Sequence, residues 1–340
     1  MELNTHPAFC KASLQEKKMS MKSSSAVIGL FMLFALSEVQ ASDFPSAPIR
    51  LVVPYPPGGP VDFVARVVGI PLGQELGQPI VIENKAGAGG NIAANELSRA
   101  KADGYTLSLV YETHATTNLF YKNFKWDAFK SFDYISLLGY SPLVLTTSTQ
   151  SGLDTLPKLI TALKERPGAL NQAITGPGAA SVLKPELLHQ AMSTKVTYVP
   201  FSGVAPALQA LVGGQIDIAL VSVTAALPLI QSKKVNAVAV GAVKPLAALP
   251  GVPAMSSAIP GFESTAWVGI VAPKGLSSEV FGRLQTAVQK VMMSDAVRKQ
   301  LEASTFVVLA TDQKGFTDRA RADYRDAEHL VQKGVLKPDE

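Results

Sequence analysis

The sequence predicts an α/β protein in which parallel strands alternate with helices. Residues 51–53 are a short apolar run suited to a buried strand, and apolar residues recur at helical spacing over 61–72. Residues 79–101 repeat the order of strand, glycine turn and helix. The chain has 340 residues, of which 47% are hydrophobic and 17% charged, so it is globular and long enough for two domains.

The first unit ends its strand at a proline-rich turn. The prolines within residues 54–57 have no amide hydrogen, so the strand cannot continue through them. Gly58 and Gly59 allow a close approach of the backbone, and Pro60 suits the first position of a helix. Free amide groups and the positive end of the helix dipole point into such a turn, which favours a carboxylate or phosphate. An ordinary strand-to-helix connection without a ligand is the alternative.

The first forty-one residues are different in kind. A basic start, an apolar stretch over 26–36 and a small-residue site ending at Ala41 predict an export signal that is cleaved after Ala41. The apolar stretch is too short to span the roughly 30 Å of a bilayer core. The single cysteine, Cys10, lies in this leader, so the mature chain from Ser42 has no thiol. Disulfides, thiolate catalysis and cysteine metal ligands are thereby excluded.

The charge of the mature chain is close to balanced. Removal of residues 1–41 takes away four lysines and three glutamates, which lowers the formal net charge from +4 to +3. No run of basic residues is longer than Lys233–Lys234, so we expect no nucleic acid partner. No later segment has eighteen apolar residues without a charge or a break, so we expect a soluble mature protein.

The remaining elements continue the same alternation. Asn91 can cap the second helix, and a turn at 103–104 leads into a strand at 105–111. Two such units in succession predict a parallel sheet with both glycine turns at one crevice. Residues 114–137 are rich in aromatic side chains and lack a clear period, which favours packing. The other segments predict strands at 142–147, 173–175, 196–199, 216–221, 235–240 and 266–272 and helices at 156–164, 180–192, 205–212, 224–230, 277–293, 295–303 and 312–332. The charge of the last helix predicts a solvated face.

Motifs of hydrolases and metal sites are absent from the sequence. The mature histidines, His114, His189 and His329, are too scattered to suggest a metal site, and we predict none. The sequence has no H-E-x-x-H, no G-x-S-x-G and no Walker loop.

One signal favours an enzyme instead. Gly87, Gly89 and Gly90 open a helix, and Glu112 ends the next strand twenty-five residues after Gly87, much as in a dinucleotide site. This motif has many false positives, and an exported protein meets little nicotinamide cofactor. An exported dinucleotide-dependent oxidoreductase that uses the Gly87–Gly90 turn is therefore the alternative function.

Several specific motifs occur in one order over nearly the whole mature chain. They are residues 48–59 with Asp62, 76–91 with 103–106, 198–203 with 205–207, 213–217, 226–228, 266–267 and 272–275. Together they resemble the substrate-binding proteins of tripartite tricarboxylate transporters, the Bug family of periplasmic solute receptors.

The resemblance implies a fold and a function. The family fold is a two-lobed clamshell, or Venus flytrap, with lobe 1 at about 42–145 plus 265–340 and lobe 2 at 146–264. Its members are periplasmic and bind small carboxylates, amino acids or aromatic acids between the lobes. We therefore expect a monomeric receptor that is not an enzyme and has no cofactor. Its partners would be integral-membrane transporter subunits or a sensor.

By the same resemblance, residues 55–62 and 176–181 form the two turns that hold a ligand carboxylate. Asp62 accepts a hydrogen bond from the ligand, orders the amides of its turn, or is simply a first-turn helix charge. His114 either faces the ligand or is a packed neutral histidine. The predicted ligand-binding residues are Tyr55, Pro57, Gly58, Gly59, Asp62, Gly89, Gly90, Thr113, His114, Gly176, Gly178, Ser181, Phe201 and Ser222.

The sequence departs from the family pattern in the second lobe. Relatives usually have a polar run in the second turn, whereas here only Ser181 keeps a hydroxyl group and Pro177 lacks an amide hydrogen. The pair Val221–Ser222 stands where an acidic or amide pair is common. The cleft is therefore expected to be apolar on this side, which favours a monocarboxylate with an apolar or aromatic body over citrate.

Overall fold

The computed structural model describes residue 1 and residues 44–340, apart from 122–123, 176–178, 243, 335 and 337–340. The predicted export signal lies outside the described residues. Residues 45–340 form one unit, in which two groups of parallel strands are joined by long antiparallel strands. No helix in the described part of the chain has both the length and the apolar character that a membrane crossing requires.

The first parallel group has the predicted order of strand, turn and helix. Leu51 of the central strand pairs with Ile82 on one side and with Leu107 on the other, and all three strands run in the same direction. The prediction of a parallel sheet with two glycine turns at one edge is confirmed. The elements of this group are β1 (Ile49–Val53), α2 (Pro60–Leu76), β2 (Ile80–Asn84), the 3₁₀ turn η1 (Ala88–Gly90), α3 (Asn91–Leu97) and β3 (Thr106–Tyr111).

The second parallel group repeats this arrangement with the strand order β7-β5-β6. Its helices α7 and α8 bury small and branched apolar residues against the strands, and Ser222 caps α8 by accepting a hydrogen bond from the amide of Ala225. Its elements are η2 (Thr149–Ser151), α5 (Leu156–Glu165), β5 (Asn171–Ile174), α6 (Ala179–Met192), β6 (Thr197–Pro200), α7 (Val204–Val212), β7 (Ile218–Ser222) and α8 (Val223–Gln231).

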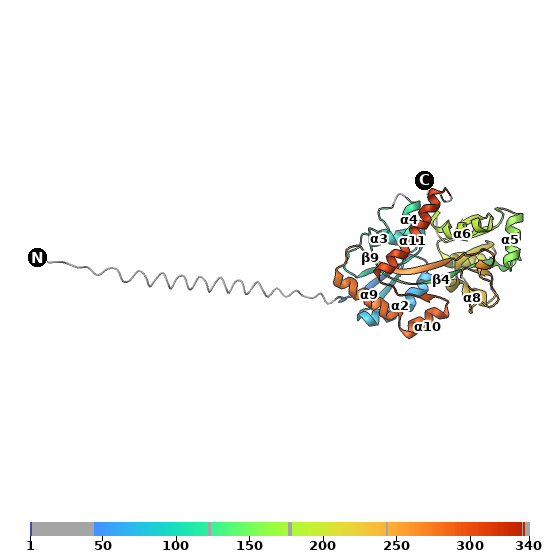
Figure 1. Ribbon diagram of the computed structural model, residues 1–340. Coiled ribbons are helices and arrows are strands. Elements are labelled where there is room, and N and C mark those ends of the chain that lie inside the picture. Colours follow the sequence, from blue (N-terminus) through green and yellow to red (C-terminus); the bar gives the residue numbers. More distant parts are fainter. Residues whose placement is uncertain (2–43, 122–123, 176–178, 243, 335, 337–340) are drawn as a thin grey trace. The chain divides into compact units, whose positions relative to one another are not determined.

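Two antiparallel strands connect the groups (Figure 1). β4 (Phe132–Ser148) pairs with β9 (Thr265–Pro273) as far as Pro142, and from Leu143 onwards it pairs with β7 and with β8 (Val235–Val240). The strand order is β2-β1-β3-β9-β4-β7-β5-β6, and β8 and the short β10 (Val307–Val308) also pair with β4. The predicted α/β class is confirmed, and the antiparallel connection makes the sheet mixed.

The connection is narrow where the chain passes between the groups. The amide of Leu143 donates to the carbonyl of Ser264, the amide of Ser264 donates to Gly241, and the amide of Gly241 donates to Leu143. A Cβ atom on Gly241 would lie 2.4 Å from the Ser264 carbonyl oxygen, so only glycine fits there. These bonds link β4, the residue after β8 and the residue before β9 at the place where the chain crosses between the two groups.

Residues 114–137 contain more regular structure than their sequence indicates. The helix α4 (Thr113–Phe120) begins the segment, and its β-branched threonines concealed the helical pattern. β4 starts at Phe132, ten residues before the predicted strand, because two irregularities in its pairing break the alternation of side chains. Gly139 lies at one of them, where a Cβ would be 2.1 Å from the Val307 carbonyl oxygen.

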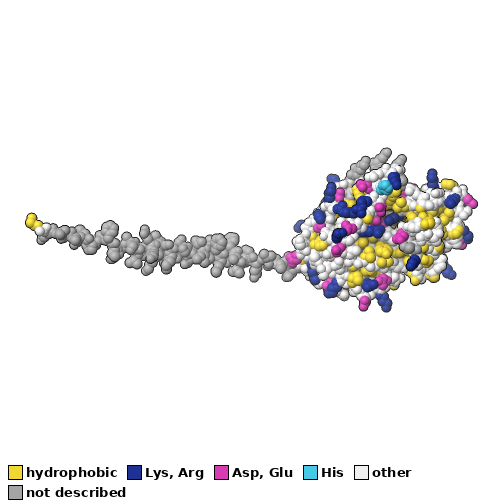
Figure 2. Space-filling model, in the orientation of Figure 1, with side chains coloured by type: hydrophobic (Ala, Val, Ile, Leu, Met, Phe, Trp, Pro, Cys, Tyr) yellow, Lys and Arg dark blue, Asp and Glu magenta, His cyan; other side chains and the backbone are white. Residues whose placement is uncertain are grey.

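The C-terminal helices return to the first parallel group. Ser277 and Asp312 cap two of them by accepting hydrogen bonds from the amides of Val280 and Gly315. α9 packs against α2, and α11 packs against α4 and β4. The elements are η3 (Met255–Ser257), α9 (Ser278–Met292), α10 (Asp295–Ala303) and α11 (Gln313–Gln332). Basic and acidic side chains are interspersed on the visible surface (Figure 2).

Candidate functional site

The turn after β1 is closed by an internal carboxylate. Gly58 has a φ of +80°, and its amide donates to Oδ2 of Asp62 over 2.9 Å. Gly59 precedes α2 in an extended conformation, and among the described residues its amide has no acceptor. Pro57 and Gly58 are exposed at the tip. The turn thus holds its shape through Asp62, and the Gly59 amide at the start of a 17-residue helix is left over.

Asp62 has no free hydrogen-bonding capacity for a ligand. Its carboxylate is 3% exposed and accepts from Arg66 at 2.9 and 3.0 Å and from the side chain of Asn84 at 2.9 Å, besides Gly58. Burial opposes ionisation, but these hydrogen bonds outweigh it, so the pKa of Asp62 lies below its usual value. Of the roles considered for this residue, the structure favours the ordering of the turn.

Tyr55 joins the ends of the first three strands. Its hydroxyl lies 3.2 Å from Oγ1 of Thr113, and its ring meets Tyr111 edge-on at 5.9 Å. A Cβ atom on Gly90 would lie 3.5 Å from the Tyr55 hydroxyl, so the second glycine turn packs directly on this side chain. Burial raises the pKa of Tyr55 to about 12, which keeps its hydroxyl protonated.

His114 lies in an aromatic cluster and not in an open cleft. Its ring stacks on Trp126 at 5.1 Å and meets Phe132 edge-on at 4.9 Å. It is 7% exposed, burial lowers its pKa to about 3, and its Nε2 has no partner among the described residues. The cavity that it lines with Gly89 and Gly90 measures about 10 Å³, so of the two alternatives the structure favours a packed neutral histidine.

The same small cavity also tests whether the Gly87–Gly90 turn can bind a dinucleotide. α3 is only seven residues long, and the turn before it is filled by Tyr55 and Pro54. A pyrophosphate needs open amides at the start of a helix, and the cavity of about 10 Å³ gives no room for one. The geometry gives no support to the dinucleotide alternative.

The β1 turn meets the second parallel group at β5 and α7. A Cβ atom on Gly203 would lie 2.9 Å from Cδ of Pro56, and Tyr55, Gly59 and Thr175 line the small space beside this contact. Further in, Ser222 is 1% exposed and hydrogen-bonds to the side chain of Tyr111. The two groups thus touch at their strand ends.

Other predicted residues of the second group lie elsewhere or are not described. Phe201 is half-buried and packs against the core formed by α7, α8 and their strands. Gly176 and Gly178 lie outside the described residues. Ser181 lies in α6, and its side chain is outside the described part.

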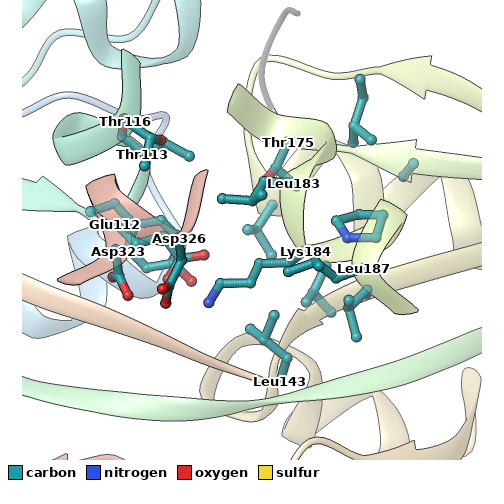
Figure 3. Close-up of a pocket in the computed structure, with 17 residues that line it drawn as sticks. Glu112, Thr113, Thr116, Leu143, Thr175, Leu183, Lys184, Leu187, Asp323 and Asp326 are labelled. Carbon is teal, nitrogen blue, oxygen red and sulfur yellow. The ribbon is translucent and has the colours of Figure 1, made fainter. Parts of the chain in front are cut away.

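A cavity of about 90 Å³ opens where β3, α6 and α11 come together (Figure 3). Its polar lining includes Glu112, Lys184, Asp323 and Asp326 together with Thr113 and Thr116, and its other walls are mostly apolar. Figure 3 shows the Lys184 side chain extending towards the three carboxylates. Apart from Thr113, none of these six residues was among the predicted binding residues.

Glu112 is the polar residue of this cavity with the most perturbed environment. Its carboxylate accepts from the backbone amide of Trp267, whereas its Oε2 is buried without a partner among the described residues. Burial raises the pKa of Glu112 to about 7, Lys184 opposes this rise, and Asp323 adds to it. The position of Glu112 at a strand end was the signal that could have identified it.

Asp323 corrects the expectation that the charges of the last helix are simply solvated. Its Oδ2 accepts from the indole of Trp267 at 2.5 Å, and its Oδ1 pairs with Arg319 at 3.4 Å. The contact with Trp267 depends on how α11 packs over β9, so the spacing of charges in the sequence could not reveal it. The pair with Arg319 lies within α11, one helical turn apart, and follows from that spacing.

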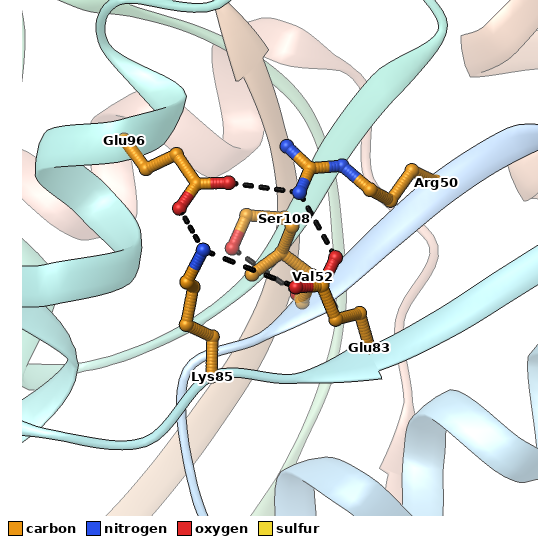
Figure 4. A network of polar contacts seen from close by, with 6 residues as sticks. All are labelled: Arg50, Val52, Glu83, Lys85, Glu96 and Ser108. Carbon is orange, nitrogen blue, oxygen red and sulfur yellow. Dashed lines mark hydrogen bonds and ion pairs between the residues drawn. The ribbon is translucent and has the colours of Figure 1, made fainter.

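A separate group of charges stabilises the scaffold (Figure 4). Arg50 donates to Glu83 at 2.9 Å and to Glu96 at 2.8 Å, and Lys85 also pairs with Glu96. The hydrogen bonds from Lys85 and then Arg50 lower the pKa of Glu96. This network ties β1, β2 and α3 together, and all its carboxylates are paired.

Comparison with known proteins gives consistent results. Residues 64–335 match the family model described as tripartite tricarboxylate transporter family receptor. The chain is 33% identical over 306 residues to protein BugT of Bordetella pertussis, covering 88% of this chain and 94% of BugT. The structure of MatC from Rhodopseudomonas palustris with bound malate is 31% identical with a TM-score of 0.79, covering 85% of this chain and all of MatC. The structure of R. palustris Rpa4515 with adipate is 26% identical with a TM-score of 0.82, covering 87% of this chain and all of Rpa4515.

Proposed function

Because the chain belongs to the tripartite tricarboxylate transporter receptor family, we propose that it captures a small carboxylate between two lobes at the β1 turn. The observation that carries this proposal is the close contact between Pro56 and Gly203, where the β1 turn of the first parallel group packs against the second parallel group. The solved relatives with malate and adipate supply the class of ligand. The protein acts as a receptor and not as an enzyme.

The proposed boundaries of the lobes lie where β4 and β9 pass between the two parallel groups. Lobe 1 comprises residues 42–145 plus 265–340, and lobe 2 comprises residues 146–264. β4 changes partner between Pro142 and Leu143, and β9 begins at Thr265, which supports these boundaries. The bonds of Leu143 with Gly241 and Ser264 are the hinge.

The β1 turn has the chemistry to hold a carboxylate. The Gly59 amide lies at the positive end of α2, and such amides form charge-assisted hydrogen bonds about twice as strong as neutral ones. Asp62 does not repel the ligand strongly, since Arg66 neutralises its charge within the same turn.

Ligand binding would then be coupled to lobe closure. A ligand favours the closed form only to the extent that it binds that form better than the open one. The contacts of Pro56 with Gly203 and of Tyr111 with Ser222 are made when the lobes are together. Transporter subunits in the membrane or a sensor protein would recognise the closed state, and the receptor itself would act as a periplasmic monomer.

Thermal unfolding of the purified protein with a panel of carboxylates tests this function. A ligand at a hundred times its dissociation constant adds about 2.7 kcal/mol to the free energy of unfolding, which raises the melting temperature measurably. We expect stabilisation by at least one class of small carboxylate and none by NAD. Turnover of a ligand, or stabilisation by NAD alone, would contradict the proposal.

A further inference from the structure

The cavity between β3, α6 and α11 contains unpaired groups of both signs. Lys184 forms no ion pair with any described residue, and Oε2 of Glu112 is buried without a hydrogen-bond donor among those residues. We propose that this cavity binds a zwitterionic ligand, an amino acid whose ammonium faces Glu112 and whose carboxylate faces Lys184. The cavity shares Tyr111, Thr175 and Val204 with the space beside the β1 turn. The inference rests on the proposed receptor function and names its class of ligand.

Glu112 is already positioned by the fold. The backbone amide of Trp267 holds its carboxylate, while Oε2 remains free on the cavity side. A buried oxygen without a donor is costly, since it has lost its hydration and gained nothing in return. A ligand ammonium would supply that donor, because it carries three N–H groups.

Lys184 comes from the other side of the cavity. It lies on α6, in the second parallel group, whereas Glu112 follows β3 in the first, and Figure 3 shows the lysine side chain reaching across between them. An anion near Lys184 is thus bound from one lobe and a cation near Glu112 from the other. A ligand with both charges would bring the two lobes together.

The neighbouring acidic residues do not have the same role. Asp323 is paired with Trp267 and Arg319, so its oxygens are occupied. Asp326 is exposed at the edge of the cavity. The carboxylate of Asp326 makes this side of the cavity unfavourable for an anion and favourable for a cation, which orients a zwitterion with its ammonium towards α11.

The rest of the cavity favours an apolar side chain on the ligand. Leu143, Leu183, Leu187 and Val204 line it. A single water molecule needs roughly 10–15 Å³, so the space of about 90 Å³ can admit the polar head of a small ligand. A dicarboxylate would place its second charge against these leucines or beside Glu112.

Matched pairs of ligands test the inference by isothermal titration calorimetry at pH 7.5. The probes are L-leucine with 4-methylpentanoate, L-phenylalanine with 3-phenylpropionate and L-aspartate with succinate. In at least one pair, we expect the amino acid to bind at least tenfold more tightly than the acid without the amine. Equal or tighter binding of every plain acid would overturn the inference and leave the receptor function intact. If no member of any pair binds and no other carboxylate does either, the receptor function fails too.

Two variants test which side chains recognise the ammonium and the carboxylate of the ligand. Glu112→Gln keeps the size of the side chain and removes its charge, so it should reduce amino acid binding about tenfold and leave plain acid binding equal or tighter. Lys184→Met should weaken both members of a pair. Glu302→Gln, on an exposed ion pair of α10, is the matched control and should change neither. An unchanged preference in Glu112→Gln would overturn the assignment.

The pH dependence of the unaltered protein provides a test that needs no variant. Lys184 on α6, Tyr111 on β3 and Asp323, Asp326 and Arg319 on α11 are the titratable or charged groups around Glu112. Since the pKa of Glu112 is about 7, amino acid binding should strengthen from pH 6 to pH 8 and release a proton from Glu112. Plain acid binding should not strengthen, because ionised Glu112 repels it. The opposite order would contradict the inference.

Discussion

The β1 turn and the charged cavity are both polar, but they differ in how their groups are paired. In the turn, Asp62 accepts four hydrogen bonds and has its charge neutralised by Arg66. In the cavity, Glu112 keeps a buried oxygen free and Lys184 has no ion pair among the described residues. A fully paired group fixes the shape of a site, whereas an unpaired buried group is available to a ligand. The following predictions test this difference, from the largest expected effect to the smallest.

Asp62→Ala should be the most destabilising of these changes. It removes a buried carboxylate, leaves the Gly58 amide and the Arg66 side chain without this acceptor, and leaves the Asn84 side-chain amide with only the Tyr55 carbonyl. We expect a loss of about 2–4 kcal/mol in the free energy of unfolding, measured by urea denaturation. Asp154→Ala is the control, since its pair with Lys158 is solvent-exposed and no measurable loss is expected. Equal losses in the two variants would show that the pairing in the turn is not structural.

Glu112→Gln should remove a pH-dependent loss of stability. Burial raises the pKa of Glu112 to about 7, so the folded protein holds this proton more tightly than the unfolded chain does. The penalty for ionising the buried group therefore accumulates as the pH rises from about 4.3 to about 7. Without ligand, the variant should gain about 1–3 kcal/mol relative to the unaltered protein between pH 5 and pH 8.

Melting temperatures of both proteins at several pH values provide the measurement. If the difference in melting temperature between the two proteins stays constant across this pH range, the pKa of Glu112 is not raised by burial.

Gly203→Ala should hold the β1 turn away from the start of α7. The added Cβ would lie 2.9 Å from Pro56 across the contact, and the backbone at this position is extended, so the clash is the only source of strain. We expect ligand affinity to fall about tenfold, which corresponds to about 1.4 kcal/mol, with little change in stability. Gly213→Ala, at the other end of α7, has contacts no closer than 3.5 Å and should bind ligand normally. Similar binding by both variants would show that closure does not need this contact.

His114→Phe should have the smallest effect on binding. The ring stack on Trp126 can be kept by another aromatic ring, and the unpartnered Nε2 is replaced by carbon. We expect ligand affinity to stay within about twofold and the free energy of unfolding to change by less than about 1.5 kcal/mol. Since the pKa of His114 is lowered to about 3, its imidazole should also show no titration between pH 5 and pH 8 by NMR. A large loss of affinity would place His114 in the site after all.

The sequence by itself determined the parallel groups and their turns. A buried strand, a glycine turn and an amphipathic helix are local patterns, so β1 to β3 could be predicted from periodicity and turn residues. The same patterns, in one order, also identified the family. Local spacing likewise placed Asp62 one turn into α2, near the Gly58 amide that it binds.

Only the tertiary structure decided where the groups meet. The long β4 joins two sheets through pairings with β9 and β7, which lie far away in the sequence. The cavity brings Glu112, Lys184 and Asp323 together from three elements, and His114 is drawn into an aromatic cluster with Trp126. A residue's periodicity shows which face it occupies, but burial and pairing depend on elements distant in the chain, and these determine whether a charge stays free for a ligand.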